Sequence, residues 1–180
     1  MAFSANYELP FGKDSAGATR AHVHGWQVNM VGYWQSGLPF TVASSVTRIN
    51  TTATSDRPNM VKDPTLSDPS ILAWFDTTAF AAQALGTAGD EPRNALEGPA
   101  QRRLDLSVFK SFSIGARGSL QMRFEVFNVT NTANFSNPIN TIAGYDANGV
   151  PLTANGFGRI TSTAPNNVPR QMQFGIKYLF

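Results

Sequence analysis

Between residues 170 and 180, apolar and polar side chains alternate almost without interruption. The apolar set is Met172, Phe174, Ile176, Tyr178 and Phe180, and only Leu179 breaks the polar set between them. Because a β-strand sends alternate side chains to opposite faces, this segment predicts a strand with one apolar and one mostly polar face. An aromatic ring at the end of such a strand suits a membrane–water interface, so the pattern favours a membrane β-barrel over a soluble sheet.

Four other segments carry the same alternation. We expect antiparallel strands at about 2–11, 25–42, 103–113, 118–130 and 169–180. Each has about the 9–11 residues that a tilted strand needs to cross a bilayer. Two aromatic pairs on the apolar parity are eight residues apart, which is roughly 26 Å along a strand. After tilting, this distance is close to the ~25 Å between barrel girdles. We therefore place five aromatic residues at the membrane interfaces: Phe3, Phe11, Trp26, Trp34 and Phe112.

The opposite parity of the last two strands is polar and is expected to face the wet interior of the barrel. Arg123 and Glu125 lie one strand step apart there. They contact a solute or a plug domain, or they form a simple charge ladder, and the sequence leaves both alternatives open. Lys110 falls on the apolar parity, where its stem is expected to reach the headgroups. The lumen-facing candidates are Gln121, Arg123, Glu125, Gln171, Gln173 and Lys177.

The connections alternate between short and long, as the periplasmic turns and outer loops of bacterial barrels do. We expect periplasmic turns at about 12–24 and 114–117 and extracellular loops at about 43–102 and 131–168. A soluble β-sandwich would have connections of a few residues, and it remains the second alternative. The first loop contains several prolines and three aromatic residues, which predicts a compact structure of its own. The aromatics are candidates for ligand contact, or they pack the loop over the barrel mouth: Trp74, Phe75 and Phe80.

Composition excludes several other classes of protein. Charged residues make up 14% of the chain, compared with about 25% in soluble domains. No apolar run approaches the ~18 to 20 residues of a membrane helix. The net charge of +2 is scattered, which disfavours nucleic acid as a partner. The chain has no cysteine, so it forms neither disulfides nor thiolate metal sites.

Signals for chemistry are weak throughout the chain. His22 and His24 share one parity but have no clear third metal ligand. Segment 146–149, Asp-Ala-Asn-Gly, lacks most ligands of a calcium loop and is expected to form a tight turn. No histidine accompanies a plausible nucleophile. We therefore expect no enzymatic activity, no cofactor and no metal site.

Five strands are too few to close a barrel. An open edge leaves unpaired backbone groups in hydrocarbon at several kcal/mol each, and single-chain bacterial barrels have at least about 8 strands. We therefore expect an all-β chain that forms the C-terminal part of a larger barrel. On this expectation Met1 is an internal methionine or the start of a truncated reading frame.

An ordered series of short motifs supports a more specific comparison. The series includes Tyr-Glu-Leu-Pro-Phe-Gly-Lys at 7–13, Gln-Ser-Gly-Leu-Pro-Phe-Thr-Val at 35–42 and Arg-Pro-Asn at 57–59. It continues with Trp-Phe-Asp at 74–76, Asp-Leu-Ser-Val-Phe-Lys at 105–110 and Arg-Phe-Glu-Val-Phe-Asn-Val-Thr-Asn at 123–131. Together these motifs resemble the C-terminal barrel end of TonB-dependent outer-membrane receptors. The closest group is the Oar-like receptors, which carry a carboxypeptidase-regulatory-like N-terminal domain.

The resemblance implies a cell outer-membrane location, a 22-stranded barrel and a plug domain. It also implies uptake of a large scarce solute (a glycan, a peptide or a siderophore) with energy passed from TonB. The implied partners are outer-membrane lipid, the barrel-assembly machinery, the unknown solute and the TonB complex, reached through an N-terminal part that this sequence lacks. The assembly machinery would read the C-terminal residues Phe174, Ile176, Tyr178 and Phe180. The alternative is a barrel without TonB, such as a porin-like channel or an adhesin translocator.

Overall fold

The structure is a computed structural model, and it describes residues 1–12, 16–49, 55–115 and 118–180. Parts of both predicted turns and of the first predicted loop, namely 13–15, 116–117 and 50–54, lie outside these ranges. The chain divides into two compact units. The strand unit comprises residues 1–35, 101–133 and 166–180, and the loop unit comprises residues 36–100 and 134–165.

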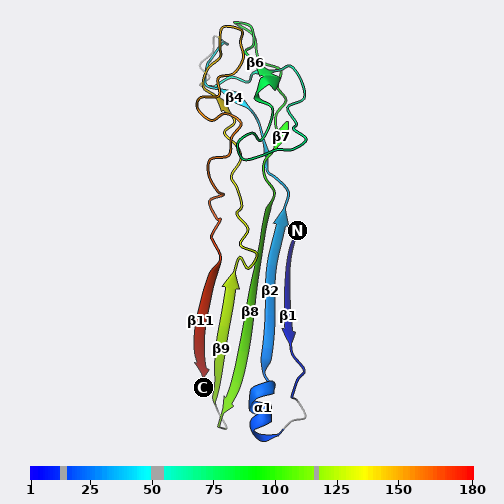
Figure 1. The fold of residues 1–180 in the computed structure, drawn as a ribbon, viewed down its shortest axis with the longest axis vertical. Coiled ribbons are helices and arrows are strands. Elements are labelled where there is room, and N and C mark those ends of the chain that lie inside the picture. The colour runs from blue at the N-terminus through cyan, green and yellow to red at the C-terminus, as the bar shows by residue number, and fades with distance from the viewer. Residues whose placement is uncertain (13–15, 50–54, 116–117) are drawn as a thin grey trace. The chain divides into compact units, whose positions relative to one another are not determined.

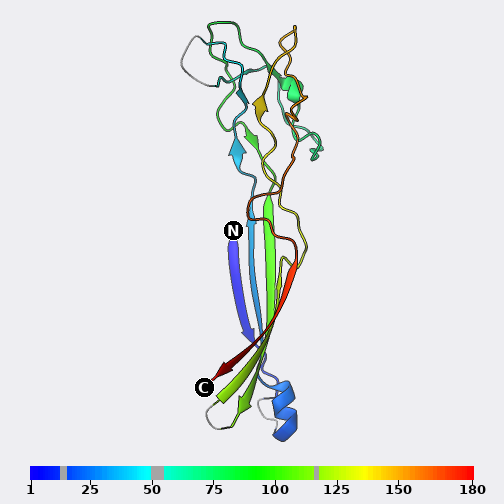
Figure 2. The same ribbon diagram turned by 90° about the vertical axis from the view of Figure 1, so that its left-hand side faces the viewer.

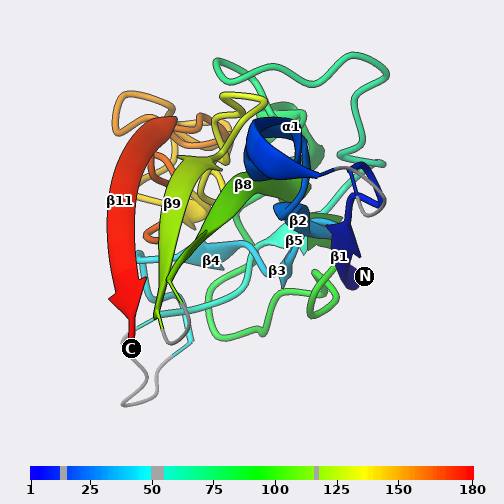
Figure 3. The ribbon, with the colours of Figure 1, turned by 90° about the horizontal axis from the view of Figure 1, so that it is seen from below.

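The strand unit is one five-stranded antiparallel sheet in which neighbours follow the order β1-β2-β8-β9-β11 (Figure 1). The sheet is open, with β1 and β11 as its two edges. Figures 2 and 3 show that it is twisted rather than flat, as chirality requires. Its strands are β1 (Ala2–Glu8), β2 (Trp26–Gln35), β8 (Gln101–Ile114), β9 (Gly118–Phe127) and β11 (Gln171–Leu179).

The register places the apolar parities of all five strands on one face. One row across the sheet runs through Tyr7, Val28, Val108, Phe124 and Phe174. The row beside it is formed by Ala5, Met30, Leu106, Val126 and Met172. Directly opposed side chains in a sheet lie on the same face. The predicted apolar face is therefore confirmed as one continuous surface.

Gly32 interrupts the apolar residues of β2, and an aromatic ring fills its place. Gly32 is paired with Phe3 on β1. A Cβ atom at residue 32 would lie only 2.6 Å from Cζ of the Phe3 ring. The ring thus lies over the bare backbone, which is a known way of covering a glycine in a strand.

Several boundaries differ from the expected ones. The predicted strand 25–42 leaves the sheet at Gln35, because Gly37 and Pro39 interrupt it. The predicted turn 12–24 contains a short helix, α1 (Gly17–Val23), shown between β1 and β2 in Figure 1. In the part of the chain that the structure describes, no helix is long and apolar enough to span a membrane.

The loop unit has a small aromatic core of its own. The Phe75 ring contacts the Phe157 ring at a centroid distance of 5.2 Å and the Phe80 ring at 5.8 Å. Phe40 and Ile142 complete this buried cluster with three smaller members. The prediction that the first loop has a compact structure is confirmed, and the second loop shares the same core.

Short paired strands connect the segments around this core. Antiparallel pairs join β3 to β7 and β5 to β6, and a parallel pair joins β10 to β4. The elements are β3 (Pro39–Phe40), β4 (Ala43–Ser44), β5 (Asn59–Met60), η1 (Thr77–Ala79), β6 (Phe80–Ala81), β7 (Leu96–Glu97) and β10 (Thr141–Ile142).

Candidate membrane interface

The apolar face of the sheet exposes large side chains that a water-soluble fold would bury. Trp34 is 64% exposed, Met172 is 64% exposed and Phe174 is 59% exposed. Surfaces of this kind and extent mark a membrane or a protein partner. Four of the five predicted interface aromatics, all except Phe11, lie on the strands of this face: Phe3, Trp26, Trp34 and Phe112. Phe11 lies beyond the end of β1 at Glu8, so the predicted strand 2–11 is too long.

The C-terminal residues expected to guide assembly also lie on this face. Phe174, Ile176 and Tyr178 pair with apolar residues of β9. Phe180 follows the last strand residue, and its ring stacks on that of Tyr178 with a centroid distance of 6.0 Å. On this face, the edge strand β11 is therefore apolar along its whole length.

Lys110 interrupts the apolar face and is 5% exposed. Its ammonium group lies 4.8 Å from the centroid of the Phe112 ring and 5.5 Å from that of Trp26. The same group donates a hydrogen bond to the backbone carbonyl of His24. Two aromatic faces and a carbonyl compensate the charge locally. The amine thus has partners within the protein at this end of the sheet, and its extension toward headgroups stays a prediction.

The polar face brings together part of the predicted lumen-facing set. The Arg123 guanidinium donates from Nε to Oε1 of Gln121 at 2.7 Å and stacks over the ring of Phe109 at 4.7 Å. Glu125 is paired across the sheet with Gln173. Phe109 was not among the predicted site residues. The adjacent apolar residues Val108 and Phe109 do indicate that both faces of β8 carry an apolar side chain there.

The remaining lumen candidates fit the same face. Lys177 is paired with Gln121, and Gln171 is paired with Phe127. All six predicted residues thus share one parity of the last two strands. Their arrangement can bind polar groups through amides and charges.

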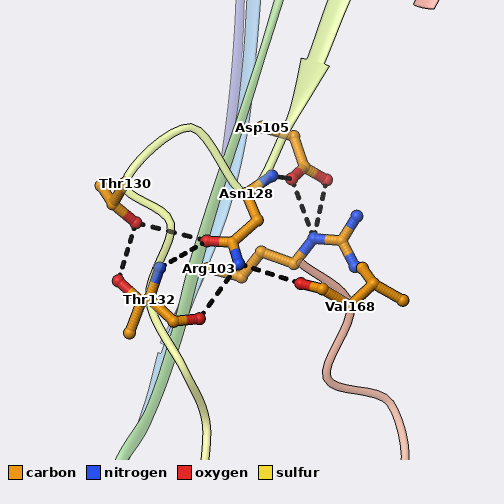
Figure 4. A network of polar contacts seen from close by, with 6 residues as sticks. All are labelled: Arg103, Asp105, Asn128, Thr130, Thr132 and Val168. Carbon is orange, nitrogen blue, oxygen red and sulfur yellow. Dashed lines mark hydrogen bonds and ion pairs between the residues drawn. The ribbon is translucent and has the colours of Figure 1, made fainter. Parts of the chain in front are cut away.

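A polar network at the end of β9 was not anticipated as a unit (Figure 4). Asn128 has a positive φ of 51° and donates from Nδ2 to the carbonyls of Thr132 and Val168, both at 3.0 Å. Its backbone N–H donates to Asp105 Oδ1 at 2.7 Å, and Arg103 Nε donates to the same oxygen at 2.8 Å. The network joins β8, the end of β9 and the chain that enters β11.

The loop aromatics divide between two roles. Phe75 and Phe80 are 2% and 1% exposed and form the core. For these two, the structure supports the packing alternative rather than ligand contact. Trp74 is half-buried, donates from Nε1 to the Glu97 carbonyl at 2.8 Å, and lines a groove with Thr65 and Pro69. Trp74 is thus the predicted ligand candidate that keeps an accessible surface.

The structure also bears on the sequence patterns that resemble metal sites. Asp146 Oδ1 accepts hydrogen bonds from the N–H groups of Asn148 at 2.9 Å and Val150 at 2.8 Å. The tight turn predicted at 146–149 is confirmed. Within the described ranges, no three His, Asp or Glu side chains come together as a metal site would require.

A comparison with known protein families shows which kind of protein presents this apolar face. Residues 1–173 match the family described as outer membrane beta barrel domain. The chain belongs to this family. No curated protein and no solved structure matched it.

Membership in this family decides between the outer-membrane barrel and the soluble β-sandwich, which the sequence left open. An outer membrane beta barrel domain places the chain in the cell outer membrane and explains the exposed apolar face. The soluble β-sandwich alternative is wrong, because the strand unit is one sheet whose apolar face has no second sheet packed on it among the described residues.

Proposed function

We propose that this chain forms the C-terminal strands and outer loops of a TonB-dependent receptor for a large, scarce solute. The observation that carries the proposal is the folding of both long connections into one unit with a shared aromatic core. A receptor needs an ordered surface that holds a solute before transport. An open channel needs only loops that leave its entrance free.

The motif series and the polar face support the same proposal. The segment 123–131, which carries the resemblance to these receptors, contains both Arg123 on the polar face and Asn128 in the polar network. The expected 22-stranded closure, the plug domain and the Oar-like N-terminal domain are part of this proposal. We propose no enzymatic role.

Two measurements on the full-length protein from outer membranes test the proposal. A TonB-dependent receptor should bind the purified periplasmic domain of TonB, whereas a porin from the same membranes should not. In planar bilayers, a barrel occluded by a plug should give no steady conductance. Steady open-channel steps without TonB binding would instead support the porin-like alternative.

A further inference from the structure

We infer that the loop unit holds a binding site for an anionic solute, in a cleft lined by Arg57 and Arg93. The inference rests on the proposed receptor function and gives the chemistry of its solute as carboxylate or phosphate. The cleft has a volume of about 550 Å³, within the range of small-molecule sites. Its other lining residues are Thr41, Ile49, Ser55, Asp56, Ala88, Gly89 and Asn94.

The charges of the cleft favour an anion. Arg57 and Arg93 are both exposed. Asp56, the one carboxylate among the described lining residues, is 4% exposed. Asp56 Oδ2 accepts hydrogen bonds from the N–H of Ile49 at 3.1 Å and from Gln83 Nε2 at 3.0 Å. These donors compensate the buried negative charge locally. The two positive groups therefore dominate what a solute meets from outside.

The Arg57 side chain is positioned by the chain beneath it. Its Nη1 donates to the Glu91 carbonyl at 2.7 Å. The bond uses one of the five N–H groups of a guanidinium and leaves others for a ligand. Since a guanidinium presents its donors as a flat fork, it matches the paired oxygens of a carboxylate or phosphate.

The backbone around the cleft is fixed by two local features. Gly89 lies so close to residue 57 that an added Cβ would be 2.0 Å from the Arg57 carbonyl oxygen. Elsewhere in the wall, Thr41 Oγ1 accepts a hydrogen bond from the N–H of Asn94 at 2.8 Å, next to Arg93. Both arginines thus extend from segments whose backbone is constrained, which reduces the ordering cost of binding.

The lining also argues against a neutral sugar. Among the described residues that line the cleft, none is aromatic. Sites for neutral saccharides gain much of their affinity from stacking on an exposed ring, and this cleft offers guanidinium groups instead. The Trp74 groove, which has a ring, is lined by a different set of residues.

Calorimetry with the full-length protein in detergent tests the site. The probes are citrate, trigalacturonate, inorganic phosphate and the neutral sugar maltotriose. Citrate or trigalacturonate binding without phosphate binding identifies a carboxylate ligand, and the reverse result identifies a phosphate ligand. Either result should weaken as salt is added, because exposed charges are screened.

Variants separate the cleft from general charge effects. Arg93→Gln should weaken binding of the anion by about 10-fold or more, the loss expected for one charge-assisted hydrogen bond. Arg159→Gln is the matched control, because Arg159 is an exposed arginine of the loop unit that does not line the cleft. Arg57→Lys keeps the charge and loses the fork, so it should also weaken binding.

Three outcomes overturn the inference. They are no binding of any anion, tighter binding of maltotriose than of the anions, and equal losses for Arg93→Gln and Arg159→Gln. TonB-domain binding by the same protein sample keeps the receptor proposal separate from this result. A sample that binds TonB but no anion would retain the receptor and remove the anion site.

Discussion

Asn128 shows how one side chain can end a strand and hold two neighbouring segments. Its positive φ turns the chain after β9, and asparagine tolerates this conformation better than most residues. The side chain then bonds the backbone on both sides, through Thr132 and Val168. The sequence motif that supports the family resemblance is therefore explained in part by architecture rather than by ligand binding.

Replacing Asn128 tests this role. Asn128→Ala removes four side-chain hydrogen bonds and leaves a left-handed alanine. We expect a loss of about 2–4 kcal/mol in the free energy of unfolding, measured by urea titration of the protein in detergent. The control Asn148→Ala changes an exposed turn residue and should alter stability by less than about 0.5 kcal/mol. Equal effects of the two substitutions would contradict the assignment.

Glu91 is a buried carboxyl group with an incomplete set of partners. It is 0% exposed, and its Oε1 accepts a hydrogen bond from the Val42 N–H at 3.1 Å, while Oε2 has no hydrogen-bond partner. Burial raises the pKa of Glu91 above 4.5, and the effect outweighs the Val42 hydrogen bond and the nearby Arg57 charge. The folded loop unit therefore retains this proton more strongly than the unfolded chain does.

The pH dependence follows from that difference. Between the unfolded and folded pKa values of Glu91, the folded state binds more protons, so stability falls as the pH rises from about 4.5. Glu91→Gln should remove this fall and stabilise the loop unit at neutral pH. The fluorescence of Trp74 during urea unfolding measures the stability of the loop unit at each pH, in a variant that also carries Trp26→Phe and Trp34→Phe. An unchanged pH profile in the glutamine variant would count against the prediction.

Asp76 contributes to stability over a different pH range. Its pKa is lowered, first by the hydrogen bond from Lys62 and then by that from Thr78. The contribution is present above pH 3.8 and is lost as the pH falls through the lower folded value. Because both partners are substantially exposed, the pair contributes little. The fall in stability above pH 4.5 can therefore be assigned to Glu91.

At the scale of the elements, the strands were predictable because the alternation of apolar and polar residues within each strand defines its two faces. Alternation over Leu120, Met122, Phe124 and Val126 defines which side of β9 is apolar without reference to any neighbour. The end of β2 and the helix α1 could not be read from this alternation. Just past β2, the Leu38 carbonyl accepts a hydrogen bond from the distant Gly98 N–H at 3.0 Å. Beside α1, Trp26 Nε1 donates to the His22 carbonyl at 2.9 Å, a local bond that an alternating pattern does not record.

The loop unit was the least predictable part for the same reason. Trp74, Phe75 and Phe80 cannot be told apart from the sequence, because aromatic residues look alike until their contacts are known. The ring of Phe157, 82 positions after Phe75 in the sequence, is what buries two of them. The Arg57–Arg93 cleft also needs segments that only folding brings together.

Adjacent residues of β8 give a direct test of the two faces. Val108 lies in an apolar row that crosses the whole sheet, and Ser107 lies in the polar row beside Asn29 and Glu125. Val108→Lys should cost about 2–4 kcal/mol near the bilayer midplane, whereas Ser107→Lys should cost little. The measurement is the amount of folded protein in outer membranes, scored by heat-dependent migration on gels. Similar levels for both variants would contradict the assigned faces.

At the scale of the whole molecule, the chain consists of two units with separate means of stabilisation. The strand unit relies on backbone pairing and on contact between its apolar face and lipid. The loop unit relies on a conventional buried core around Phe75 and Phe157. A defect in one unit should therefore leave the other largely intact.

Phe157→Ala tests this independence. Removing a ring that is 1% exposed should destabilise the loop unit by about 3–5 kcal/mol. We expect unchanged levels in the outer membrane and faster cleavage of the loops when intact cells are treated with a protease. Leu152→Ala, at an exposed site of the same unit, is the control. Loss of the whole protein from the membrane would show that the units depend on each other.

The register of the sheet has a consequence for assembly errors. Moving β9 by one residue against β8 would carry Arg123 and Glu125 to the lipid side and turn Phe124 inward. A charged side chain near the bilayer midplane costs about 2–4 kcal/mol. Because a shifted strand would place charged side chains in the lipid hydrocarbon, the membrane itself disfavours the wrong register of this sheet.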